Sequence, residues 1–160
     1  MSFPKVGNLA PVLTLTDQNG DKVSLKDFRG ESNVVLYFYP KALTPGCTNQ
    51  ACGIRDHRKA FAKANTTVLA VSPDPVKKLV KFVDKHGLDF TLLSDEDLVA
   101  TKKYGCWALK KFMGKEYMGV LRTTFIIGKD GRLKHIMDKV KTKSHDADVL
   151  ALIDELGLKD

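Results

Sequence analysis

The chain has 160 residues, of which 26 are Lys or Arg and 19 are Asp or Glu, so its formal net charge is +7. With 43% hydrophobic and 28% charged residues it has a globular composition, which excludes a disordered or collagen-like chain. This length predicts a single domain over residues 1–160.

The positive charge predicts at most a weak preference for acidic partners. The basic residues come mostly as separated pairs, such as Lys77-Lys78, Lys102-Lys103 and Lys110-Lys111. Scattered pairs are typical of a solvated surface, so we expect no nucleic-acid binding. No run approaches the roughly 18 apolar residues of a membrane span, and the first residues carry no secretory or organelle-targeting pattern. We therefore expect a cytoplasmic protein without membrane contact.

The N-terminal part of the chain predicts only short strands. Residues 9–16 are apolar but include Pro11, which favours at best an edge strand or a short one. Residues 18–21 contain an Asn-Gly turn signal, and residues 23–25 continue the chain on its far side. A small antiparallel unit is the simplest interpretation.

The next segment predicts a buried strand followed by a helix. Residues 33–39 are β-branched or aromatic apart from Asn33 and Leu36, a pattern typical of a central strand that is buried on both faces. Pro40 ends this strand, and Thr44-Pro45-Gly46 predicts a turn. From Cys47 to about Lys63 the apolar residues recur at helical spacing, which predicts one continuous helix.

The middle of the chain continues the alternation. Residues 67–71 predict a buried strand, and the spacing from Val76 to Val83 predicts a helix that ends at Gly87. Residues 91–93 predict a short strand. Residues 94–97 (Ser-Asp-Glu-Asp) predict an acidic first turn of a helix that runs through Tyr104. Residues 115–119 are typical of a turn or hairpin region.

The C-terminal part predicts a hairpin and a closing helix. Residues 123–127 and 133–140 predict two antiparallel strands joined by a tight turn at 129–131, and Ser144 is expected to cap the last helix. The whole order of elements predicts an α/β fold with a mixed central sheet flanked by helices. Ligands of such sheets bind at the carboxyl ends of strands, so the segment after Tyr39 is the first place to look for chemistry.

That segment contains a cysteine at the start of a helix. The free N–H groups and partial positive charge there favour the thiolate of Cys47, and Thr44 places a hydroxyl three residues before it. Cys52, five residues further on, could capture an oxidised form of Cys47. The alternative is that both cysteines are ordinary buried thiols. The preceding Pro45-Gly46 and the nearby strand end favour a functional pair.

The other candidate ligands predict no metal site. Cys47, Cys52, Cys106 and the four histidines show no closed ligand spacing, so we expect neither a zinc site nor a cofactor. An odd number of cysteines also argues against a structural disulfide framework. Cys106, between Gly105 and Trp107, is expected to be a bystander, and His57 a surface or capping residue.

Residues 38–52 (Phe-Tyr-Pro-Lys-Ala-Leu-Thr-Pro-Gly-Cys-Thr-Asn-Gln-Ala-Cys) resemble the active-site segment of the peroxiredoxins. Within that family they are most similar to the bacterioferritin-comigratory, or Q-type, subgroup. The likeness extends to residues 17–20, 93–97, 112–115 and 122–125. It implies a thioredoxin-like fold and reduction of hydrogen peroxide and organic hydroperoxides. It further implies a monomer that is recycled by thioredoxin or a similar dithiol reductant.

The resemblance also implies roles for individual residues. Cys47 matches the peroxidatic cysteine, and Cys52 matches the resolving cysteine of an intramolecular disulfide. Thr44 matches the residue that bonds the thiolate and the peroxide, Pro40 the proline that shields the pocket, and Arg122 the guanidinium that stabilises the thiolate. Some Q-type members carry the resolving cysteine in the next helix, but residues 75–86 of this chain contain no cysteine.

Three other interpretations stay open at this point. A general disulfide reductase would favour a Cys-x-x-Cys motif, and the spacing of Cys47 and Cys52 speaks against it. A basic nucleic-acid module would need a clustered patch. Cys52 could also be inert, with a partner thiol resolving Cys47 directly. On one intact helix the two Cα atoms would lie about 8.7 Å apart, beyond the roughly 7 Å that a disulfide allows, so the pairing requires the helix to open.

Overall fold

The computed structural model describes residues 2–158. Its main sheet has seven strands in the order β2-β1-β5-β4-β3-β8-β9. The strands are β1 (Thr14–Asp17), β2 (Lys22–Ser24), β3 (Asn33–Phe38), β4 (Thr66–Ser72), β5 (Thr91–Ser94), β8 (Thr123–Ile127) and β9 (Leu133–Met137). β3, β4 and β5 are parallel to one another and the remaining pairs are antiparallel. The mixed sheet that the sequence predicts is thereby confirmed.

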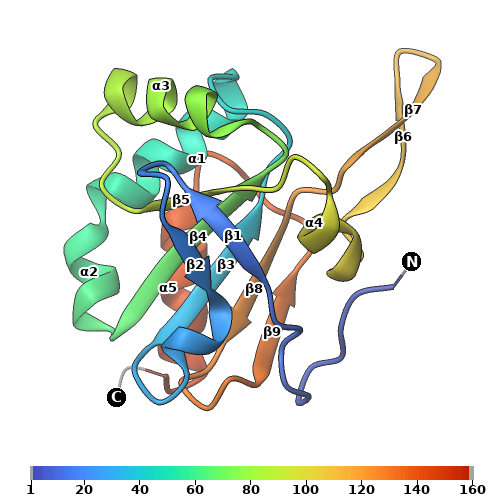
Figure 1. The fold of residues 1–160 in the computed structure, drawn as a ribbon. Coiled ribbons are helices and arrows are strands. Elements are labelled where there is room, and N and C mark those ends of the chain that lie inside the picture. The colour runs from blue at the N-terminus through green and yellow to red at the C-terminus, as the bar shows by residue number, and fades with distance from the viewer. Residues whose placement is uncertain (1, 159–160) are drawn as a thin grey trace.

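Helices cover one face of this sheet more completely than the other (Figure 1). The helices are α1 (Pro45–Asp56), α2 (Arg58–Lys63), α3 (Val76–His86), α4 (Val99–Lys103) and α5 (His145–Glu155). One face packs against α1, α2, α3 and α5, which bury Ile54, Phe61, Phe82 and Val149. The other face is covered by α4, a 3-10 helix at Leu25–Phe28 and the N-terminal segment.

β3 lies in the middle of the sheet and leads directly to the chemistry. All six of its residues are buried, because both faces of the sheet are covered and both neighbouring strands are in place. It pairs with β4 on one side and with β8 on the other, where Phe38 is opposite Thr123. The end of β3 and the start of β8 therefore lie side by side.

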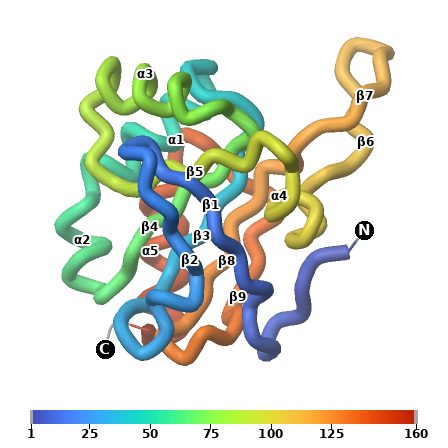
Figure 2. Tube along the Cα trace, in the orientation of Figure 1, coloured from blue at the N-terminus to red at the C-terminus, as the bar shows by residue number. Residues whose placement is uncertain are grey.

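A hairpin of β6 (Trp107–Phe112) and β7 (Lys115–Val120) forms a second sheet that projects from the body (Figures 1 and 2). The sequence analysis placed a turn or hairpin region at residues 115–119 and did not find β6. The hairpin exposes apolar side chains that the sequence analysis did not single out: Leu109, Phe112, Met113, Tyr117 and Met118.

The N-terminal segment is held against the second face of the sheet. The ring of Phe3 meets Phe125 of β8 edge-on, with 5.9 Å between the ring centroids. Gly105 has a positive φ of +72°, and a Cβ atom there would lie 2.5 Å from the carbonyl oxygen of Ser2. Only glycine fits at this close approach of two backbones.

Two expected elements differ in the structure. The strand expected at residues 9–16 begins only at Thr14, after Pro11; of the two expected alternatives it is the short strand and not the edge strand, because β1 has four residues and pairs with both β2 and β5. The helix expected from Cys47 to Lys63 begins at Pro45 and is divided at His57 into α1 and α2. The two segments still bury Ile54 and Phe61 in the same core, which is why their apolar spacing resembled one helix.

Two further boundaries were also wrong. Ser94 belongs to β5, and the expected helix after it is reduced to α4, which starts at Val99. The carboxylate of Asp95 accepts hydrogen bonds from the N–H groups of Ala100 and Thr101, so this acidic residue caps α4 from outside the helix. β9 ends at Met137 rather than at residue 140.

Ser144 stands at the N-terminal boundary of α5, as expected, although its hydroxyl bonds the side chain of Asp148 instead of a backbone N–H. Among residues 2–158, no helix has the length and apolar character of a membrane span. The single domain expected over residues 1–160 stays a prediction, and Met1, Lys159 and Asp160 lie outside the described residues.

Candidate active site

Cys47 lies in the first turn of α1, at the carboxyl end of β3. Thr44 is the residue before the helix and has an extended backbone, and Pro45 follows at the first helical position, where its missing N–H is not needed. The fixed φ of proline favours the helix start, which places Cys47 next to the unpaired N–H groups of the first turn. Cys47 is only 1% exposed.

A buried aspartate holds the loop that precedes this turn. Leu43 has a φ of +68°, an unfavourable conformation for a residue with a side chain. The carboxylate of Asp74 accepts a 2.7 Å hydrogen bond from the N–H of Ala42 and a 2.9 Å bond from Ser72, at the end of β4. Because β3 and β4 are parallel, their carboxyl ends meet, and Asp74 can fix the loop from the neighbouring strand.

Arg122 lies directly before β8 and reaches Cys47 across the end of β3. Its Nη2 donates to the sulfur at 3.3 Å, and its Nη1 donates to Oε1 of Gln50 at 2.7 Å. The antiparallel pairing of β8 with β3 brings Arg122 to this place. A fixed guanidinium next to the sulfur favours the charged nucleophile and supplies a donor to a substrate oxygen.

Gln50 continues this contact into the interior. Its Nε2 lies 3.2 Å from Nδ1 of His145, and Nε2 of His145 lies 2.7 Å from Oγ1 of Thr124. The imidazole also meets the ring of Tyr37 edge-on, at 5.2 Å between centroids. The pKa of His145 is lowered from 6.5 to about 4, chiefly by burial and to a smaller extent by Arg122, while Asp146 and Asp148 act in the opposite direction. Burial likewise raises the pKa of the Tyr37 hydroxyl well above its usual range.

The other predicted site residues, Thr44, Pro40 and Cys52, are near Cys47 in the sequence. Thr44 is half-buried, and its hydroxyl donates to the carbonyl of Lys41 at 2.8 Å, which leaves its oxygen lone pairs available as acceptors. Pro40 is half-buried and follows the end of β3 by two residues. Cys52 is half-buried on the same helix as Cys47, and both thiols are free.

Lys110 of the projecting hairpin adds a second cation to this region. Its Nζ donates to the carbonyl of Val120 at 3.0 Å. Burial lowers the pKa of Lys110 and the neighbouring Arg122 lowers it further, while Cys47 acts in the opposite direction. The sequence analysis counted Lys110 among the scattered surface pairs, but the structure places it within electrostatic reach of Arg122 and Cys47.

Two candidate residues lie outside this group. Cys106 is fully buried under the opposite face of the sheet, where burial raises its pKa to about 12, so its thiol is protonated at neutral pH. His57 is half-exposed at the end of α1, and its Nδ1 lies 2.6 Å from a carboxylate oxygen of Asp146. Residues 2–158 contain no group of three or more potential ligands that could hold a metal ion.

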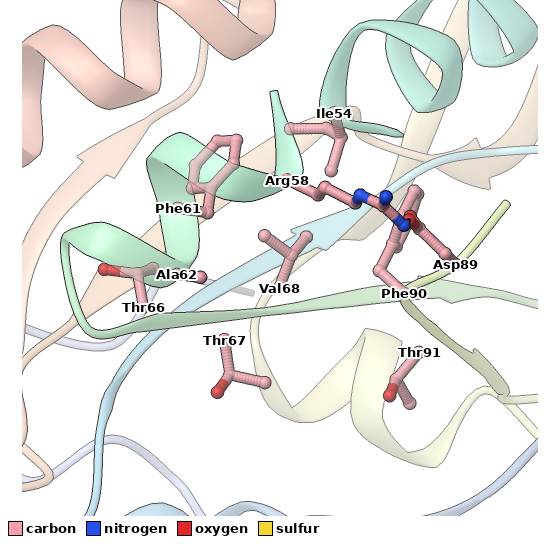
Figure 3. Close-up of a pocket in the computed structure, with 10 residues that line it drawn as sticks. All are labelled: Ile54, Arg58, Phe61, Ala62, Thr66, Thr67, Val68, Asp89, Phe90 and Thr91. Carbon is pink, nitrogen blue, oxygen red and sulfur yellow. The ribbon is translucent and has the colours of Figure 1, made fainter. Parts of the chain in front are cut away.

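A separate cavity of about 280 Å³ lies between the end of α1, α2 and the starts of β4 and β5 (Figure 3). The Arg58–Asp89 ion pair, at 2.6 Å, stands on one side of it, and Ile54, Phe61 and Val68 supply apolar walls. None of the five predicted site residues lines this cavity. The chemistry is therefore expected at the loop before α1 and not in this hollow.

Gln50, His145 and Asp74 were not predicted from the sequence. Gln50 is on the same helix as Cys47, three residues further on, which could have marked it as a neighbour of the sulfur. Asp74 follows a strand end that is parallel to β3, a placement that was also readable. His145 is 95 residues away from Gln50 in the sequence, and only the packing of α5 against α1 brings the two together.

Comparison with known proteins places these features in a family. Residues 6–136 match the model of the AhpC/TSA family. The chain is 48% identical over 151 residues to Peroxiredoxin Bcp of Escherichia coli strain K12, a match that covers 94% of this chain and 96% of that protein.

Solved structures give the same likeness in three dimensions. The bacterioferritin comigratory protein of Xanthomonas campestris, described for its alkyl peroxide reduction activity, superposes with a TM-score of 0.84 at 33% identity, covering 89% of this chain and 90% of that one. A mutant of PrxQ from Xylella fastidiosa superposes with a TM-score of 0.91 at 29% identity, covering 98% of this chain and 99% of that one. The expected thioredoxin-like fold is confirmed.

Proposed function

The chain belongs to the AhpC/TSA family and is a peroxiredoxin, hence a thiol peroxidase, and from that premise we propose that Cys47 is the residue that reduces the hydroperoxide. The single observation that carries this assignment is the 3.3 Å contact between Arg122 and the Cys47 sulfur at the start of α1. Cys52 lacks the first-turn position, and Cys106 is a fully buried thiol on the other side of the sheet.

The proposed first step is a displacement on the O–O bond. The thiolate of Cys47 attacks the terminal oxygen of the hydroperoxide, so an S–O bond forms while the O–O bond breaks. The leaving oxygen takes a proton and departs as water or an alcohol, and Cys47 becomes a sulfenic acid. Arg122 and the backbone N–H groups of the first turn can stabilise the charge on the breaking bond.

Thr44 and Pro40 serve this step by positioning and shielding. The Thr44 hydroxyl already donates to Lys41, so its oxygen can accept the proton-bearing end of the peroxide. Pro40 is half-buried two residues after the end of β3 and offers no N–H, and its proposed role is to shield the thiol from water. Both roles are supported by the family resemblance and by the short distance along the chain to Cys47.

The second step forms the disulfide. The sulfur of Cys52 attacks the sulfenic sulfur of Cys47, an S–S bond forms and water leaves. Thioredoxin or a similar dithiol then reduces the disulfide and returns both thiols. Hydrogen peroxide and organic hydroperoxides are the proposed substrates, and the alkyl peroxide activity of the Xanthomonas relative supports the second class. A monomeric state and a cytoplasmic location stay predictions.

The test is single-turnover thiol loss after peroxide is added to the reduced protein. Cys47→Ser is expected to abolish peroxide reduction while keeping the fold, because a serine hydroxyl is a far poorer nucleophile at neutral pH. Cys106→Ala is the matched control and should keep the wild-type rate, since this thiol is buried away from the site. Appreciable turnover by folded Cys47→Ser would contradict the assignment.

A further inference from the structure

The hydrogen bonds of Arg122 determine how the amide of Gln50 is oriented and which ring nitrogen of His145 carries the proton. A guanidinium can only donate, so the Gln50 atom that faces Nη1 must be the amide oxygen. The NH₂ group of Gln50 then points to Nδ1 of His145 and donates to it. Nδ1 must therefore be unprotonated, and the single ring proton resides on Nε2, which donates to Thr124.

We propose that neutral His145 is a positioning residue for the peroxidase reaction: through Gln50 it holds Arg122 against the sulfur of Cys47. The proposal goes beyond the role of Cys47 but rests on it, because the positioned contact is the one to that sulfur. His145 itself touches neither Cys47 nor the substrate path in any contact of the described residues.

Protonation of His145 is incompatible with this chain of hydrogen bonds. A proton on Nδ1 of His145 would face the NH₂ group of Gln50, and two donors cannot form a hydrogen bond with each other. Rotating the amide by 180° would satisfy His145 but would turn the NH₂ group toward Arg122, again donor against donor. No orientation of Gln50 serves both neighbours, so the protonated imidazole loosens either Arg122 or the packing of α1 on α5.

The same series of hydrogen bonds makes the stability of the closed α1 depend on pH. Gln50 is in the first half of α1. When this part of α1 opens, the side-chain amide of Gln50 moves away from His145, and Nδ1 of His145 can then take a proton. The pKa of His145 is about 4 while the chain is closed, against an ordinary value of 6.5. Because the pKa of His145 is lower when α1 is closed than when it is open, the free energy that favours the closed helix has its full value above pH 6.5. This free energy decreases progressively as the pH falls toward 4.

Several other groups face His145 and must be separated from it. Asp146 and Asp148 lie on its own helix, Tyr37 packs against it from β3, and Arg122 approaches from the start of β8. The carboxylate of Asp146 also pairs with His57 at the end of α1. His57 is a second imidazole in contact with this helix and is therefore the rival explanation for any acid-driven opening of α1.

The test is hydrogen exchange over residues 45–55 of the reduced protein between pH 4 and 7, with no peroxide present. After correction for intrinsic exchange, opening of α1 in the wild type is expected to rise toward tenfold per pH unit below about 6.5. His145→Asn keeps an acceptor for Gln50 but has no titrating group, so this rise should be lost. His57→Asn should retain it. A rise that persists in His145→Asn and disappears in His57→Asn would overturn the pH link.

The positioning role is tested by the peroxide reaction itself. His145→Leu removes the acceptor, and single-turnover thiol loss at pH 7 should slow about tenfold, the factor expected for one lost hydrogen bond, while His145→Asn recovers most of the rate. A folded His145→Leu protein with the wild-type rate would refute the role. Failure of the Cys47 assignment is distinguishable, because Cys47→Ser would then keep turnover and the exchange experiment would be unaffected.

Discussion

Arg122 makes two directed contacts at once, and both are needed to fix the guanidinium. One nitrogen donates to Cys47 and a second donates to Gln50, so the planar group cannot rotate away from the sulfur without losing the Gln50 bond. A lysine ammonium has the same charge but no fork geometry, so it cannot reproduce this pair of contacts at fixed positions. Charge and orientation can therefore be separated by substitution.

Arg122→Ala should slow the reaction of Cys47 with peroxide by about 10²-fold or more, the usual effect of removing one transition-state donor. Arg122→Lys should fall between Ala and the wild type, because it restores charge but not orientation. The measurement is single-turnover thiol loss at several peroxide concentrations. Reduction of the oxidised enzyme by the dithiol partner should change much less.

Arg132→Ala is the matched control for this pair of variants. Arg132 is exposed in the turn between β8 and β9, at the end of β8 that pairs with the start of β3, and its guanidinium donates to the carbonyl of Gly7. It should react with peroxide like the wild type. Equal rates for Arg122→Ala and Arg132→Ala would remove Arg122 from the mechanism.

Among single residues, the sequence predicted a site residue only where a local pattern marks it. Cys47 was recognisable from the turn and helix start around it, and Arg122 only from the family resemblance. Gln50 and His145 depend on which helix packs against which, and no spacing along the chain encodes that contact. Lys110 was predicted to belong to the solvated surface. The sequence around a lysine pair does not show whether one of its side chains is partly buried near another charged group, as Lys110 is near Arg122.

Among the elements, α1 is the one that the proposed Cys47–Cys52 disulfide would require to change. Five residues along a helix correspond to a rotation of roughly 140°, so Cys47 and Cys52 lie on different sides of α1. Their Cα atoms are about 8.7 Å apart on a regular helix, whereas a disulfide requires about 7 Å or less. Cys47 is also buried, so its sulfur must move outward to meet Cys52.

We expect α1 to unwind when Cys47 and Cys52 form their disulfide. Peptide mapping after one equivalent of peroxide should find the Cys47–Cys52 bond, and hydrogen exchange over residues 45–55 should rise on oxidation. A disulfide without faster exchange would refute the unwinding. The absence of any such bond would instead favour an inert Cys52 and direct resolution by a partner thiol.

Some elements were predictable from the sequence and others were not, for identifiable reasons. β3 and β8 are buried on both faces, so their composition alone marks them as strands. β6 has three exposed residues out of six, including Leu109 and Phe112, and it pairs only within its own hairpin. Its sequence therefore shows neither continuous burial nor a clean alternation of apolar and polar residues.

For the molecule as a whole, the N-terminal segment completes the second hydrophobic core. Phe3 packs on Phe125, which itself contacts the rings of Phe38 and Tyr104. These rings lie on the face of the sheet that is covered by the short α4, the 3-10 helix Leu25–Phe28 and irregular segments. Phe3 is consequently expected to contribute to the stability of the fold.

Phe3→Ala should lower the free energy of unfolding by about 1–3 kcal/mol, because it removes an aromatic contact from a partly buried site. Val6→Ala, at a side chain that is 57% exposed, is the control and should change stability little. Thermal denaturation of both variants gives the comparison, and the peroxide rate at 25 °C should be unchanged. Equal melting temperatures for the two variants would show that the N-terminal segment is dispensable.

In the proposed cycle, the break between α1 and α2 at His57 would limit the number of residues that lose and regain order. Ordering one residue costs about 1–2 kcal/mol, so every residue that opens must be ordered again when the disulfide is reduced. α2 starts its own hydrogen bonds after His57 and is anchored by buried Phe61, so its six residues can stay folded while α1 opens. A single helix from Cys47 to Lys63 would have no such boundary, and reclosing it would require ordering a longer segment.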